Sequence, residues 1–126
     1  MKKIISTDKA PSAIGPYSQA IIANGMLFTS GQLPIDPKTN EFAGNDIESQ
    51  AKQCMENIKA ILESENLQMS KIIKTTIFLT DLGTFAKVNE IYARYFKENP
   101  PSRSTVQVAA LPKGAMIEIE AIAITN

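Results

Sequence analysis

Residues 99–126 read NPPSRSTVQVAALPKGAMIEIEAIAITN and are the most strand-like stretch of the chain. The two prolines at its start stop a preceding helix and favour extended backbone, so we predict that a strand begins near Arg103. Residues 116–124 alternate between two faces and become apolar on both, which is typical of a strand that is covered on both sides. Glu118 and Glu120 therefore lie where full solvation is not expected.

Between these two strand patterns, residues 111–114 (LPKG) have the proline and glycine positions of a tight turn. We therefore predict an antiparallel hairpin. In this register Gln107 lies opposite Glu118, Thr105 opposite Glu120 and Arg103 opposite Ile122, all on one face of the sheet. A guanidinium, a hydroxyl, an amide and two carboxylates would then share a surface. A shift of one residue would move the acids to the other face.

The composition predicts a single globular domain over residues 1–126, with 44% hydrophobic and 21% charged residues. Thirteen basic and thirteen acidic residues give no net charge and are interspersed, which argues against a nucleic-acid partner. No long apolar run predicts a membrane span or a signal peptide. One cysteine cannot form an internal disulfide, so we expect a cytoplasmic protein.

The chain contains no histidine. This excludes a Ser-His triad, a Cys-His pair and a histidine-bound zinc. Acid–base chemistry must then use a carboxylate, a tyrosine, a lysine or water.

The N-terminal part predicts short strands separated by loops. Residues 2–6 form a first strand, and the loop 10–19, rich in proline and glycine, carries Tyr17. Two apolar runs then meet at Asn24-Gly25, the pair preferred in a type I′ hairpin because both residues need positive φ.

The second strand of that hairpin continues into Ser30 and Gly31. A glycine here allows another group to approach the backbone closely, and a bulge or bend is the structural alternative. Residues 33–44 contain several turn-forming residues and are predicted to be a loop.

A helix is predicted to begin at Asn45, which can cap it with Glu48 three residues later. Apolar residues follow at spacings of three and four, namely Ile47, Ala51, Cys54, Met55, Ile58, Ile61 and Leu62. Cys54 lies in the middle of this stripe. We therefore interpret it as a core thiol and not as a nucleophile, which needs an exposed, electropositive setting.

Residues 71–80 (KIIKTTIFLT) are rich in β-branched residues and predict a central strand. A second helix follows, with one face made of Phe85, Val88, Asn89, Tyr92 and Phe96. Asn89 is a polar residue inside this apolar stripe. It either bonds to a loop or binds a ligand, since a buried amide needs partners in both cases.

The resulting order is β-β-β-α-β-α-β-β, which indicates an α+β fold. Two helices can cover one face of such a sheet but not both, whereas the last strand is apolar on each side. The uncovered face predicts an oligomer with sites between subunits.

Four separated stretches together resemble the RidA/YjgF family of reactive-intermediate imine deaminases: IGPYSQA, TSGQLPIDPKT, VNEIYARYF and PPSRSTVQVAALPKGAMIEIEAIA. The resemblance covers nearly the whole chain. It implies a chorismate-mutase-like fold, with a mixed sheet and two helices on one face, and a homotrimer with its sites in the clefts between subunits. It also implies hydrolysis of 2-imino acids, such as 2-iminobutanoate and 2-iminopropanoate, to 2-oxo acids and ammonia.

Transferred residue by residue, the resemblance places the carboxylate-binding arginine at Arg103, the water-associated glutamate at Glu118 and the loop tyrosine at Tyr17. Ser30 and Gly31 line the same pocket, and Asn89 and Pro112 lie nearby. Many members have a cysteine where this chain has Thr105. A thiol is therefore not required for chemistry here, and the threonine can still donate a hydrogen bond.

These residues suffice for a mechanism without a metal or an organic cofactor. Arg103 holds the substrate carboxylate in a two-pronged contact, and Glu118 orients a water and transfers its protons. Tyr17 and the backbone near Ser30 and Gly31 order substrate and water. From the residues alone, an interface ion pair between Arg103 and Glu118 is an equal alternative, and only the resemblance favours catalysis.

Two further functions stay open. One is a non-catalytic trimer that uses the same arginine to sense a small carboxylate metabolite. The other is RNA cleavage, which has been attached to relatives of the family. The lack of a histidine pair and of a basic groove disfavours it.

Overall fold

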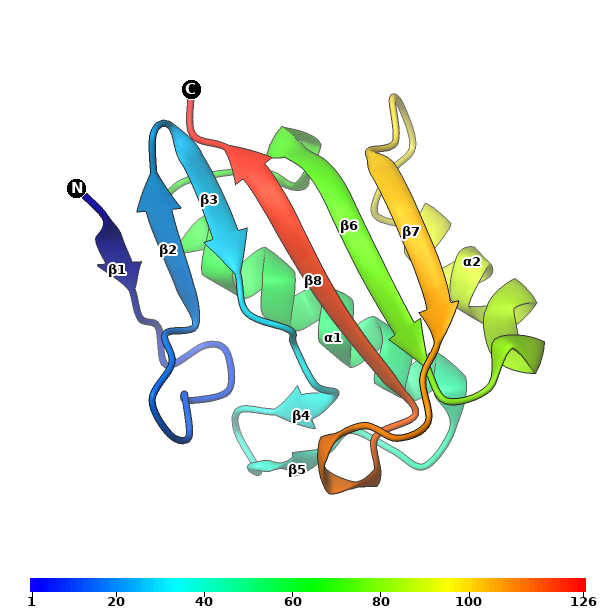
Figure 1. Cartoon of the computed structure of the whole chain (residues 1–126). Helices are drawn as coiled ribbons and strands as arrows, with labels where there is room; N and C mark the ends of the chain where they lie inside the picture. Colours follow the sequence, from blue (N-terminus) through cyan, green and yellow to red (C-terminus); the bar gives the residue numbers. More distant parts are fainter.

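The computed structural model describes residues 1–126 and has a six-stranded mixed sheet with both helices packed on one face (Figure 1). The elements are β1 (Lys3–Ile5), β2 (Ala20–Ala23), β3 (Met26–Thr29), β4 (Ile35–Asp36), β5 (Glu41–Phe42), α1 (Ile47–Glu63), β6 (Ile72–Leu79), α2 (Phe85–Ala93), β7 (Ser102–Gln107) and β8 (Ile117–Ile124). The strand order is β1-β2-β3-β8-β6-β7. The predicted α+β class is confirmed. Neither helix is long and apolar enough to cross a membrane.

Two local predictions in the first half of the chain have different outcomes. Asn24 and Gly25 have φ of 51° and 74°, and they join β2 to β3 as the predicted hairpin. The predicted loop 33–44, in contrast, contains a small two-stranded ribbon in which β4 pairs with β5. Each strand of this ribbon has only two residues, and a strand pattern this short cannot be recognised in a sequence rich in turn-forming residues.

The α1 helix buries the whole predicted apolar stripe, including Cys54, which has no exposed surface. Burial raises the pKa of the Cys54 thiol well above its usual range, and the thiol donates to the Gln32 carbonyl at 3.2 Å. The predicted capping residue was wrong by one position. Asp46 is the N-cap, because its carboxylate accepts a hydrogen bond from the Ser49 backbone N–H at 2.9 Å.

The predicted hairpin between the last two strands is wrong. β6, α2 and β7 form a β-α-β unit in which β7 lies parallel to β6, with Arg103 beside Thr75. β8 occupies the other edge of β6 and runs antiparallel to it, with Glu118 beside Phe78. The turn at 111–114 exists, since the Gly114 N–H donates to the Leu111 carbonyl at 3.2 Å. It belongs to a connection that passes the end of β6.

This pairing separates the predicted polar cluster into two faces. Residues that are paired in register point to the same side of a sheet. Arg103 therefore shares the helix-covered face with buried Thr75, whereas Glu118 and Glu120 share the opposite face with Phe78 and Thr76.

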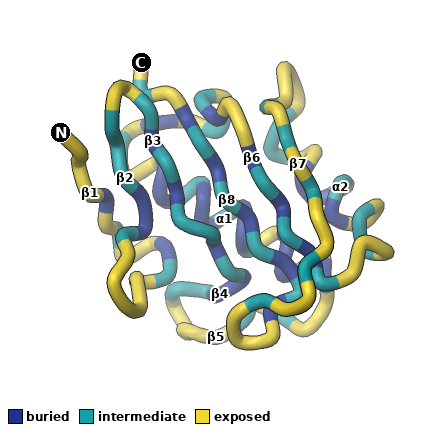
Figure 2. Tube along the Cα trace, viewed as in Figure 1, coloured by how far each residue is buried: buried dark blue, intermediate teal, exposed yellow.

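The face of the sheet that points away from the helices, here called the open face, carries many apolar side chains. They are Ile4, Ile21, Met26, Phe28, Phe78, Val106, Ile122 and Ile124. Ile4 is 61% exposed and Ile124 is 37% exposed. Figure 2 shows the strands alternating between buried and more accessible residues, as expected for a sheet covered on one side.

Candidate functional site

Five of the eight predicted site residues line one cavity of about 450 Å³, here called the Glu118 cavity. They are Tyr17, Ser30, Gly31, Pro112 and Glu118, from three separated segments of the chain. Ile14, Leu33 and Ile35 add apolar walls. The cavity therefore combines one carboxylate with an apolar lining, which is typical of a small-molecule site.

Gln19, which was not predicted, holds the loop that carries Tyr17. Its side chain is 4% exposed, and its amide nitrogen donates to the carbonyls of Thr7, Ala10 and Pro11. The Ser30 hydroxyl donates to the Ser18 carbonyl at 2.6 Å. The Ser30 hydroxyl proton is therefore engaged with the loop next to Tyr17.

Gly31 lies directly against the Glu118 carboxylate. A Cβ atom built on Gly31 would lie 1.9 Å from Glu118 Oε2, so the carboxylate would have to move to admit any side chain at position 31. This close approach, two residues beyond the end of β3, agrees with the predicted close contact at the glycine. Burial, and secondly the neighbouring Glu120 carboxylate, raises the pKa of Glu118 above its usual range.

Arg103 lies in a different place, on the helix-covered side of the edge strand β7. Its guanidinium carbon is 5.1 Å from the ring centroid of Phe85 and 5.0 Å from that of Tyr92. Nη1 donates to Asn89 Oδ1 at 2.8 Å. Arg103 and Asn89 line a second cavity of about 450 Å³, here called the Arg103 pocket, together with Phe96 and two prolines.

No acid neutralises Arg103 within the chain. The salt bridges of the chain join Lys3 to Glu65 and Lys87 to Glu48. The predicted alternative of an Arg103–Glu118 ion pair is therefore not found within one chain. An arginine that is half-buried without an acidic partner is well suited to bind an anion from outside.

Asn89 and Thr105 complete the surroundings of Arg103. The Asn89 side chain accepts a hydrogen bond from Arg103 and not from a loop. Thr105 follows two residues after Arg103 in β7, and its buried hydroxyl has no hydrogen-bond partner. The phenol of Tyr92 bonds to the Thr75 hydroxyl at 2.7 Å, which holds the ring near Arg103.

A family model described as Endoribonuclease L-PSP matches residues 7–125. The chain belongs to this family, also called RidA/YjgF. The chloroplastic Reactive Intermediate Deaminase A of Arabidopsis thaliana is 52% identical over 122 residues, 97% of this chain and 65% of that protein. A RutC family protein of Pyrococcus horikoshii is 54% identical over 123 residues, 98% of each chain. The crystal structure of E. coli TdcF with bound serine matches with a TM-score of 0.94 and 48% identity, covering 98% of this chain and 99% of that one.

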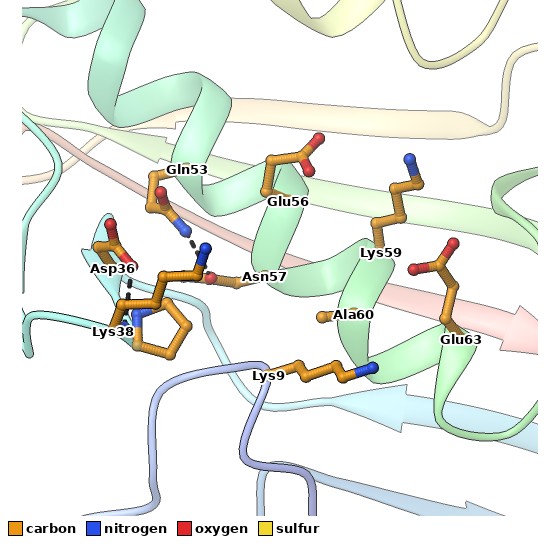
Figure 3. Close-up of a pocket in the computed structure, with 10 residues that line it drawn as sticks. Lys9, Asp36, Lys38, Gln53, Glu56, Asn57, Lys59, Ala60 and Glu63 are labelled. Carbon is orange, nitrogen blue, oxygen red and sulfur yellow. Dashed lines mark hydrogen bonds between the residues drawn. The ribbon is translucent and has the colours of Figure 1, made fainter.

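This RidA/YjgF protein has another groove of about 290 Å³ between α1 and the loop around β4 (Figure 3). Three lysines and three acids line it, namely Lys9, Lys38, Lys59, Asp36, Glu56 and Glu63. Asn57 accepts a hydrogen bond from Gln53 and donates to the carbonyls of Leu33 and Ile35 at 3.0 Å each. Leu33 and Ile35 also line the Glu118 cavity. The two hydrogen bonds from Asn57 therefore hold one wall of that cavity against α1.

Proposed function

We propose that this protein hydrolyses 2-imino acids, such as 2-iminobutanoate and 2-iminopropanoate, to 2-oxo acids and ammonia. The observation that carries the proposal is Arg103, a half-buried cation without an acidic partner, next to an open pocket. One of its N–H groups bonds to Asn89, and the others are available for a carboxylate. The plant relative is named a reactive intermediate deaminase, and the TdcF crystal structure holds serine, a small molecule with a carboxylate.

We further propose that the site forms between subunits of a homotrimer. Arg103 and Glu118 lie on opposite faces of the sheet and line different cavities, so one chain does not bring them together. The open face carries eight apolar side chains that no element of the chain covers, and such a face favours association with another copy. A neighbour packed on this face can bring its own β7 and Arg103 toward the Glu118 cavity.

In the proposed reaction, Arg103 binds the substrate carboxylate and orients the protonated C=N bond. Glu118 accepts a proton from a water as the water oxygen attacks the carbon of the protonated imine. It then gives this proton to the nitrogen, the C–N bond breaks to release ammonia, and the Glu118 carboxylate accepts the remaining hydroxyl proton as the C=O bond forms. Protonated imino acid plus water thus gives oxo acid, ammonia and one proton, which passes from Glu118 to solvent or ammonia. Proton transfer of this kind accelerates reactions by roughly 10²- to 10⁴-fold.

The raised pKa of Glu118 supports its role, because a carboxyl group that binds protons more readily is a better carrier near neutral pH. Tyr17, which is 51% exposed, can contact a ligand from the cavity rim. Thr105 has a hydroxyl without a partner, and a substrate or a neighbouring chain can supply one.

The test is a coupled assay in which a threonine or serine dehydratase generates the imine in situ. We expect the wild type to accelerate oxo-acid and ammonia release above the spontaneous rate. Arg103→Ala and Arg103→Lys fold and assemble but lose this acceleration, because lysine cannot make the two-pronged contact. A fully active, correctly folded Arg103→Ala variant would refute the assignment.

A non-catalytic carboxylate binder is the second candidate, favoured by the serine in the TdcF structure. Both functions use Arg103 to bind a carboxylate. They differ in the coupled assay, where a binder leaves the rate of imine loss at its spontaneous value.

The description of the family model also names an endoribonuclease. This chain has no histidine and equal numbers of basic and acidic residues. Single-stranded RNA binding depends on clustered basic groups and responds steeply to salt. Absence of RNA binding at low salt would exclude this function.

A further inference from the structure

We propose that helix α2 is a neutral clamp for Arg103, in which Asn89 and Phe85 are positioning residues for carboxylate recognition. The inference rests on the proposed function, because it assigns a task to residues that contact Arg103. Asn89 then acts on the substrate through Arg103, and not as a residue that binds the ligand directly.

The spacing of the clamp residues follows from helix geometry. Phe85, Asn89 and Tyr92 stand at positions i, i+4 and i+7 of α2, so their side chains lie along one face. The two rings lie within 5.1 Å of the guanidinium carbon, and the amide between them accepts a hydrogen bond from Nη1. The rings restrict the plane of the guanidinium, and the amide restricts its rotation within that plane.

The clamp is neutral, which is its chemical advantage. An acid at position 89 would hold Arg103 equally well but would also cancel its charge and compete with a substrate carboxylate. An amide oxygen and two aromatic faces hold the guanidinium without cancelling its charge. A carboxylate needs two coplanar donors in a fixed direction, so the orientation of Arg103 affects affinity directly.

The probe is pyruvate, the 2-oxo acid product of the proposed reaction, with binding measured by calorimetry on the assembled protein. We expect the Kd for pyruvate to rise about tenfold in Asn89→Ala and about a hundredfold in Asn89→Asp. Asn89→Asp keeps the shape and the hydrogen bond, so a merely structural residue would tolerate it better than Asn89→Ala. The clamp predicts the opposite order.

Lys87→Gln is the matched control. It changes the net charge by the same amount as Asn89→Asp, on the same helix, at a side chain that is 64% exposed and lies 3.9 Å from the Glu48 carboxylate. We expect its Kd for pyruvate to stay within about twofold of the wild-type value. Phe85→Leu keeps an apolar group but removes one ring, and we expect it to weaken binding about fivefold.

A double-mutant cycle completes the test. In an Arg103→Ala background, Asn89→Ala has no further effect on pyruvate binding if it acts only through Arg103. If Asn89→Ala still weakens binding there, Asn89 contacts the ligand and the clamp is refuted. Unchanged affinity in both Asn89 variants, with loss in Arg103→Ala, refutes the clamp alone. Unchanged affinity in Arg103→Ala refutes the proposed function and the clamp together.

Discussion

Gly31 lies so close to Glu118 that one added methyl group would displace the carboxylate. The built Cβ is 1.9 Å from Oε2 and 2.6 Å from Cδ, and the φ of Gly31 is not in the left-handed region. The Glu118 side chain can swing away, so the fold is expected to survive Gly31→Ala. We expect the rate of imine hydrolysis to fall about a hundredfold, because catalysis depends on sub-ångström placement. Steady-state kinetics and thermal unfolding measure the two effects.

A background variant isolates this effect. In Glu118→Ala there is no carboxylate to displace, so adding Gly31→Ala is expected to change the residual rate less than about twofold. A large further loss would show that Gly31 contributes through its own backbone or through the shape of the cavity.

Glu118 also predicts a pH dependence of stability. Burial and Glu120 raise its pKa in the folded protein, so this carboxyl group binds a proton more readily when folded. Its contribution to stability is full below the unfolded pKa and is lost as the pH rises through the folded pKa. We therefore expect Glu118→Gln to unfold at a higher temperature than wild type near pH 7, with the difference shrinking toward about pH 4. If the difference in unfolding temperature between Glu118→Gln and wild type did not change between about pH 4 and pH 7, the carboxylate of Glu118 would not be destabilised by burial.

The sequence alone identified Arg103 and Glu118 as notable residues but did not predict what surrounds them. The family resemblance grouped Tyr17, Ser30 and Gly31, and these three do line one cavity with Glu118. The partners of Arg103 were not predicted, although the polar Asn89 inside an apolar helical stripe was a signal that something charged lay near it.

The Asn57 side chain links helix α1 to the segment around β4 by hydrogen bonds. The Asn57 side chain is 1% exposed and donates to two carbonyls, those of Leu33 and Ile35. Asn57→Ala leaves both carbonyls without this donor, so we expect a loss of about 2–3 kcal/mol in the free energy of unfolding. Chemical denaturation measures it. Lys52→Ala, at an exposed position of the same helix, is the control and is expected to change stability by less than about 0.5 kcal/mol. An equal effect of both variants would contradict the role of the buried amide.

Elements were predicted well where the signal is local. The apolar stripe of α1 and the Asn24-Gly25 turn depend on neighbours a few residues away, and both are confirmed. The pairing of β7 and β8 is not local. The turn at 111–114 suggested a hairpin, but β6, α2 and β7 form a parallel unit, and β6 lies between the two last strands. The order strand, helix, strand was present in the sequence, and it favours parallel neighbours.

At the scale of the whole molecule, the open face predicts association between copies. Ile124 ends β8 on this face and is 37% exposed in a single chain, so a charge there costs the isolated fold little. If a neighbour covers the face, Ile124→Lys buries an unpaired ammonium and is expected to shift the protein from trimer to monomer. Sedimentation velocity measures the change. Leu82→Lys, at a similarly exposed residue off the sheet, is the control that stays assembled, and a trimeric Ile124→Lys would contradict the proposed interface.

The proposal that each site takes Arg103 from one chain and Glu118 from another has a direct test by mixing subunits. Arg103→Ala and Glu118→Gln trimers are each expected to have little activity, because every site lacks one of the two groups. If the two variants are unfolded together and reassembled in equal amounts, a site can combine Arg103 of a Glu118→Gln chain with Glu118 of an Arg103→Ala chain. Random assembly restores about a quarter of the sites, and so about a quarter of the wild-type activity. If both groups of a site came from the same chain, no mixed trimer could contain an intact site, and the mixture would stay as inactive as its parents.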